Sequence, residues 1–155
     1  MPDNLVEDKT TEQLVEQWKV CVEMADRVSA RRSDASKLYL SLLTGLLAVI
    51  PFVTGQATSI DIQKTVFLGF GSLGLMICCI WILNIQSYKQ LNSLKFKVIH
   101  EIEQKLPFPC FEREWQILKK EKDSRSYLRL SMIEQGIPLL LMIPYLVLLI
   151  YVLAR

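Results

Sequence analysis

The stretch TVFLGFGSLGLMICCIWILNI, from Thr65 to Ile85, contains no charged side chain. A helix needs about 20 apolar residues to cross the hydrocarbon core of a bilayer, so this stretch predicts a membrane span. Two shorter uncharged runs, Leu38–Val53 and Gly136–Leu153, predict two more spans with Tyr39 and Tyr151 at the membrane interface. The alternative is a buried hairpin in a soluble protein. We disfavour it because three such runs exceed the core of a small chain.

The composition agrees with this segregation of apolar and charged segments. The chain has 155 residues, enough for one domain, and 51% of them are hydrophobic while 22% are charged. Mean hydropathy is +0.27. These values exclude a disordered chain, a collagen-like fibre and a disulfide scaffold.

Lysine and arginine counts predict the orientation, because cytoplasmic segments carry an excess of both residues. Sixteen of the 18 lie in residues 1–37 and 86–130. We therefore expect the N-terminus to be cytoplasmic and the C-terminus to lie outside. The first apolar run follows a charged segment, so it is not a cleavable signal peptide.

The predicted fold class is an all-α membrane protein with three transmembrane helices and long cytoplasmic helical extensions. In chain order we expect a cytoplasmic amphipathic helix, a transmembrane helix, a short external loop, a transmembrane helix, a cytoplasmic helical segment with a proline elbow, and a transmembrane helix. The corresponding ranges are 1–37, 38–55, 56–64, 65–86, 87–130 and 131–154.

The N-terminal segment predicts an amphipathic helix. Thr10-x-x-Gln13 reads as a capping box that opens it. We expect it to continue into the first span, with Pro51 kinking or ending it. Its apolar seam packs either within the protomer or against a neighbouring subunit, and comprises Leu14, Trp18, Cys21, Ala25 and Val28.

The second span continues as a helix until Pro107. A stripe at helical spacing runs along this extension and comprises Leu91, Leu94, Val98, Ile102 and Leu106. Phe108, Phe111 and Trp115 follow at the corner, and we favour a packed elbow over a ligand site.

Two further patterns concern the last helices. Residues 112–122 predict a short amphipathic helix, and Ser131-x-x-Glu134 predicts a capping box for the third span. An acid near the membrane surface is alternatively a proton site, and we favour capping for Glu134.

Two stripes of small residues lie in the predicted spans, where they allow helices to approach closely. We slightly favour packing within one protomer over contacts between subunits. The stripes comprise Ser41, Gly45 and Ala48 on the first span and Gly71, Gly74 and Cys78 on the second. Gly69, Gly71 and Gly74 also match a dinucleotide-binding pattern, but no strand precedes them and no suitable acid follows.

No catalytic constellation is present, so we expect neither an enzyme nor a cofactor. With one histidine and no Cys-x-x-Cys pair, we expect neither a metal site nor a disulfide. The net charge of +4 over residues 86–130 is typical of a cytoplasmic membrane-protein segment, and we expect no nucleic-acid partner.

The apolar seams of the two extensions would be exposed in a monomer. We therefore predict a homo-oligomer, built as a closed ring whose axis follows the membrane normal.

The chain resembles the RipA family of small bacterial cytoplasmic-membrane proteins over residues 31–145. The resemblance rests on SYKQLNSLKFKVIHE, from Ser87 to Glu101, and on shorter motifs after it. These are Leu106-Pro107, Phe111-x-x-Glu114-Trp115, Tyr127 and Leu130-Ser131-x-x-Glu134.

The resemblance implies an octamer in the bacterial inner membrane, a link to stress adaptation or host interaction, and no established reaction. It also nominates candidate contacts with a partner or a neighbouring subunit. These are Tyr88, Asn92, Lys95, Lys97, Glu114, Trp115 and Glu134.

Two functional hypotheses follow. The first is a non-enzymatic platform that binds an unidentified cytoplasmic protein, because the signature residues cluster outside the spans. The second is a gated pore or membrane-perturbing effector formed by the ring, although the spans carry few polar residues.

Overall fold

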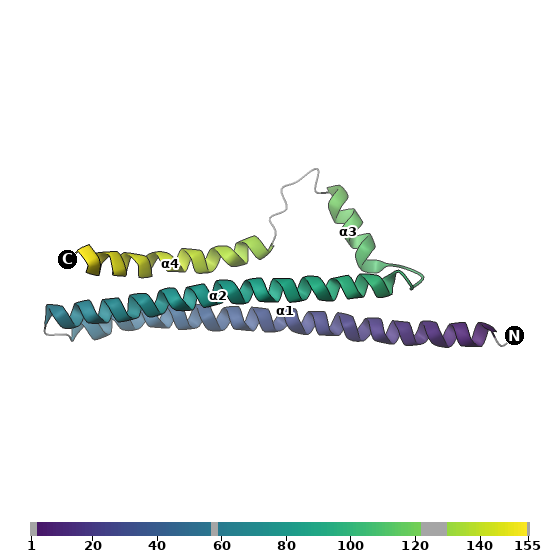
Figure 1. Ribbon diagram of the computed structural model, residues 1–155, viewed down its shortest axis with the longest axis horizontal. Coiled ribbons are helices and arrows are strands. Elements are labelled where there is room, and N and C mark those ends of the chain that lie inside the picture. The colour runs from purple at the N-terminus through teal and green to yellow at the C-terminus, as the bar shows by residue number, and fades with distance from the viewer. Residues whose placement is uncertain (1–2, 57–58, 122–129, 155) are drawn as a thin grey trace. The chain divides into compact units, whose positions relative to one another are not determined.

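The computed structural model describes residues 3–56, 59–121 and 130–154, with side chains described over 10–56, 59–117 and 133–154. Within these residues, four helices follow one another (Figure 1). They are α1 (Asp3–Gly55), α2 (Ile60–Glu103), α3 (Cys110–Glu121) and α4 (Leu130–Ala154). No strand occurs among these residues.

Helix α1 begins before the predicted capping box and ends at Gly55, the predicted end of the first span. It begins at Asp3, so the capping box at Thr10 does not open it. Residues 3–9 contain neither glycine nor proline, so nothing stops the helix from extending back to Pro2. At the other end α1 passes through Pro51 to Gly55, and the Thr54 hydroxyl donates to the Ile50 carbonyl oxygen at 2.9 Å.

Helix α2 begins beside Ser59, whose Oγ accepts a hydrogen bond from the Ile62 amide at 3.4 Å. It passes through Gly69, Gly71 and Gly74 without interruption. These glycines therefore form helix and not a phosphate-binding loop. Helix α2 ends at Glu103, before Pro107, and α3 covers most of the predicted 112–122 helix.

Among the described residues, three helices are long and apolar enough to cross a membrane. Their qualifying segments are Thr10–Gly55, Ile60–Glu103 and Ile133–Ala154. Within the spanning windows of the three, between 11% and 22% of the residues are buried. Most of each window is therefore available to lipid or to other subunits.

The chain divides into two compact units. The apolar unit comprises residues 32–87 and 129–155, and the charged unit comprises residues 1–31 and 88–128. Helices α1 and α2 contribute to both units, whereas α3 belongs to the charged unit and α4 to the apolar unit.

The core of the apolar unit lies where α1, α2 and α4 meet. Its buried members are Leu43, Cys78, Trp81, Ile85 and Tyr145. Tyr39 stacks on Trp81 with ring centroids 5.7 Å apart, and Trp81 donates from Nε1 to Ser36 Oγ at 3.4 Å. The buried Trp81 nitrogen thus has a hydrogen-bond partner, as is usual for a buried indole.

The core of the charged unit is smaller and includes a carboxylate. Ala25, Ile99 and Glu103 are its buried members. Phe111 lies between two aromatic rings, with centroids 5.9 Å from Trp18 and 5.8 Å from Phe96. Helix α3 therefore packs on α1 and α2 through one aromatic side chain.

Candidate functional site

The α2 stripe of small residues is covered by α4. Gly71, Gly74 and Cys78 are buried. A Cβ atom added at Gly74 would overlap the Tyr145 ring, and one added at Gly71 would lie 3.0 Å from the Leu149 side chain. The absence of side chains at these glycines is what lets α4 approach α2.

Tyr145 connects all three helices of the apolar unit. Its ring lies against Gly74 of α2, and its hydroxyl donates to the Leu43 carbonyl oxygen of α1 at 2.6 Å. The side chain is fully buried. A hydroxyl buried among apolar helices needs such an acceptor, because an unpaired one is costly.

The α1 stripe is open. Ser41, Gly45 and Ala48 are exposed, and nothing lies within 4 Å of a Cβ added at Gly45. The Ser41 hydroxyl donates to the Leu38 carbonyl oxygen of its own helix at 2.9 Å. This stripe is thus free to meet another surface at close range.

Glu134 lies in the apolar unit and pairs with Arg32. Arg32 Nη2 donates to Glu134 Oε1 at 3.0 Å, and both side chains are largely buried. The pair joins α1 to α4. The Ser131 side chain lies outside the described residues, so the capping box remains a prediction, as does a proton site at Glu134. Tyr127 also lies outside them.

Glu103 caps α3 from the end of α2. Its carboxylate Oε1 accepts a hydrogen bond from the Phe111 amide at 3.1 Å, and the residue is 1% exposed. An acid suits this place because the first amides of a helix lack intrahelical acceptors. His100 Nδ1 lies 3.5 Å from Glu103 Oε2. The elbow is therefore held by a carboxylate together with Phe111, whereas Phe108 and Trp115 are exposed.

The two predicted apolar seams of the charged unit differ. The α1 seam is buried or half-buried within the protomer. The α2 stripe instead lies mostly outside, with Leu91, Leu94 and Val98 exposed. Val20 and Met24 of α1 are exposed as well, and these five residues form what we call the open face. They are between 44% and 57% exposed.

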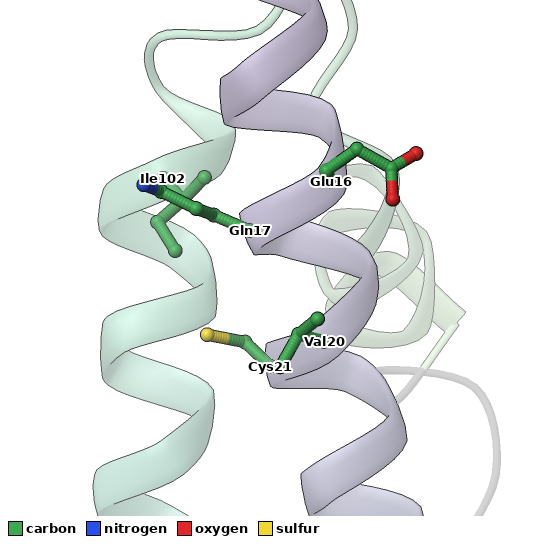
Figure 2. A pocket seen from close by; sticks show the side chains of 5 residues that line it. All are labelled: Glu16, Gln17, Val20, Cys21 and Ile102. Carbon is green, nitrogen blue, oxygen red and sulfur yellow. The ribbon is translucent and has the colours of Figure 1, made fainter.

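Two shallow grooves lie along α1 and α2 of the charged unit, and they share Cys21. The first has a volume of about 380 Å³ and includes Val20 and Ile102. Figure 2 shows Gln17 and Cys21 pointing toward α2 while Glu16 points away from it. The second has about 210 Å³ and is lined by Cys21, Met24, Leu94, Lys95 and Val98.

The signature residues do not form one surface. Tyr88, Asn92 and Lys95 lie at spacings of four and three on α2 and are half-buried, whereas Lys97 is exposed. Glu114 and Trp115 are exposed on α3. Glu134 belongs to the other unit. Their roles as contacts stay predictions.

Sequence reasoning missed Val20, Met24 and Glu103. Gln17, Val20 and Met24 recur at spacings of three and four, but the stronger seam through Trp18 masks this second periodicity. Glu103 precedes the turn that contains two prolines. An acid there is a recognisable cap only once the turn brings α3 back to it.

The described residues include no group of three or more His, Cys, Asp or Glu side chains placed to hold a metal ion. Within the same residues, Cys21, Cys78, Cys79 and Cys110 are free thiols. What the described surface offers chemically is apolar and charged contact area.

A family model described as "Octameric membrane protein family (8xMP)" matches residues 15–154. No curated protein and no solved structure matches the chain.

Proposed function

This chain belongs to the octameric membrane protein family, and we propose that it forms a ring of eight copies that serves as a non-enzymatic assembly platform. The ring lies in a bacterial inner membrane and binds a cytoplasmic partner protein. All copies share one orientation in the bilayer, so their symmetry axis follows the membrane normal.

The observation that carries the proposal is the charged unit. It has its own buried core and a capped third helix, and its described residues hold no metal-binding cluster. Anchoring in a membrane requires only the spans, so the charged unit has a further role in this proposal. Eight copies around an axis would present a crown of repeated surfaces, and repetition raises the affinity of a multivalent partner.

The excess of lysine and arginine in residues 1–37 and 86–130 supports a cytoplasmic location for this crown. The resemblance to the RipA family supports the same membrane and a role in stress adaptation or host interaction. It supports no reaction, which agrees with a binding role.

The polar side of α2 offers the surface for the partner. Lys97 and Glu101 are exposed. They follow Phe96 and His100 by one residue, so they lie about 100° around the helix from the side that meets α3. Glu101 borders the open face on the same helix, since it follows Val98 by three residues, whereas Lys97 lies about 100° from Val98. A charged rim of this kind steers and selects a partner more than it binds it.

The test is an affinity capture of the detergent-solubilised protein from its native cells, read by mass spectrometry together with native mass. We expect an octamer that carries a stoichiometric cytoplasmic protein. Lys97→Glu should lower the amount of that protein captured and keep the octamer. The matched control is Lys64→Glu, which makes the same change in the predicted external loop and should retain the partner.

An octamer that is captured alone from wild-type cells would contradict the platform. A partner retained equally by Lys97→Glu and by wild type would contradict the assignment of its binding surface to α2.

A gated pore is the second candidate, favoured by the exposed hydroxyl residues of the apolar unit. Ser41, Thr44 and Ser72 are exposed, but each hydroxyl donates to a carbonyl of its own helix. Few donors remain to line a hydrated path. Ion efflux from proteoliposomes that contain the octamer tests this candidate, and tight vesicles would reject it.

A further inference from the structure

The charged unit has two unlike sides. Helix α3 covers one side of the α1 and α2 pair, through the contacts of Phe111 with Trp18 and Phe96. Val20 and Val98 each follow those aromatic residues by two positions. Two positions correspond to about 200° around a helix, so the open face lies on the side away from α3.

A closed ring brings unlike sides together. Cyclic assembly of more than two copies uses a head-to-tail interface, in which one patch of each protomer meets a different patch of the next. The protomer therefore needs two complementary surfaces. The charged unit has an apolar groove on one side and a projecting helix on the other.

The outward surface of α3 complements the groove in polarity. Ile117 is exposed on α3, about 120° around the helix from Phe111, and Met24 and Leu94 line the groove. Burial of such side chains is favourable at roughly 25 cal/mol per Å² of apolar area.

The charges also match. Lys95 lines the groove, and Glu114 is exposed on α3, three residues before Ile117. The two have opposite charge and flank the apolar positions on their respective surfaces. A pair of this kind contributes to the register of an interface.

Building on the proposed octamer, we infer that α3 of each protomer docks on the open face of its neighbour. Ile117 enters the groove beside Met24 and Leu94, and Glu114 pairs with Lys95. The occupant of the open face is thus a second copy of this chain.

Cysteine cross-linking in native membranes tests the inference on the full-length chain. The background carries Cys21→Ser, Cys79→Ser and Cys110→Ser, since these three thiols are not fully buried. It is first shown by native mass to remain an octamer. Met24→Cys and Ile117→Cys are then introduced together, and a short bis-maleimide is added.

The double variant should give a ladder of cross-linked species that reaches eight copies. Each single variant should give none, because a head-to-tail interface does not bring two copies of one residue together. Dimers from Met24→Cys alone would overturn the inference, since they show two open faces meeting. An octamer by native mass without the ladder would overturn it as well and leave the proposed octamer standing.

A charge exchange provides an independent measurement. Lys95→Glu should raise the dissociated fraction of the octamer roughly fivefold in detergent, an effect of the size that one exposed ion pair supports. Adding Glu114→Lys should restore the octamer. Lys89→Glu serves as the matched control and should leave it intact, because Lys89 is exposed and lies on the same side of α2 as Phe96, away from the open face. Failure of the second substitution to rescue the first would contradict the pairing.

Loss of the octamer in the wild type would refute the proposed function instead. Cross-linking of Met24→Cys to a different protein, in place of the ladder, would assign the open face to a partner and overturn the inference.

Discussion

On α2, Gly71, Gly74 and Cys78 lie buried beneath α4, whereas on α1 the exposed Ser41, Gly45 and Ala48 meet nothing in the protomer. Both stripes place small residues at spacings of three or four along an apolar helix. The difference lies in the partner, because Tyr145 and Leu149 of α4 fill the space above α2. Small residues permit a close approach but do not specify which helix approaches.

The largest effect is expected from Gly74→Ala, which tests whether α4 packs closely on the α2 stripe. The added methyl group would overlap the Tyr145 ring, which is fully buried. We expect a loss of about 3 kcal/mol in the free energy of unfolding, as overpacking costs in closely packed cores. The measurement is unfolding by SDS titration in mixed micelles.

Gly69→Ala is the matched control for that experiment. Nothing lies within 4 Å of a Cβ added at Gly69, so this change should leave stability equal or slightly higher. Equal losses at Gly69 and Gly74 would mean that α4 does not lie on the α2 stripe.

Gly45→Leu tests the other stripe. Because the position is open, we expect the free energy of unfolding of the protomer to be unchanged. If the stripe meets a neighbouring subunit, the larger side chain should raise the dissociation constant of the octamer about tenfold, or about 1.4 kcal/mol. Native mass in detergent measures it, and an unaffected octamer would assign the stripe to lipid.

Tyr145→Phe measures the contribution of the Tyr145 hydroxyl to the packing of α4 on the α2 stripe. It keeps the ring on Gly74 and removes the hydrogen bond to the Leu43 carbonyl. We expect a loss of about 1 kcal/mol in the free energy of unfolding, measured in the same SDS titration. A loss as large as that of Gly74→Ala would show that the hydroxyl, and not the close fit, holds α4.

Ser41→Ala should have the smallest effect. The hydroxyl already bonds within its own helix, and the side chain is exposed. We expect less than about 0.5 kcal/mol in unfolding free energy and no change in octamer dissociation. A measurable shift in dissociation would mean that the hydroxyl bonds across the subunit contact.

Several parts of the fold were predictable from local patterns. The runs Leu38–Val53, Thr65–Ile85 and Gly136–Leu153 lie within three helices long and apolar enough to span a membrane. The elbow after Glu103 also followed from its prolines. Length and hydropathy suffice for such features because each depends on one segment alone.

The surroundings of each side chain were not predictable in this way. The stripe from Leu91 to Val98 has good helical spacing, yet it is exposed, while Ile99 and Glu103 are buried. Periodicity identifies an apolar side, but the helices that cover it come from distant segments. Arg32 and Glu134, for example, lie 102 positions apart.

The cap at Glu103 gives α3 a built-in reporter. Phe111 has an amide near the start of α3, where most amides exchange with water quickly, yet its hydrogen is held by a buried carboxylate. That amide exchanges only when Glu103 releases it. The rate of deuterium uptake at this amide therefore reports how often α3 detaches from the end of α2, with no probe attached to the protein.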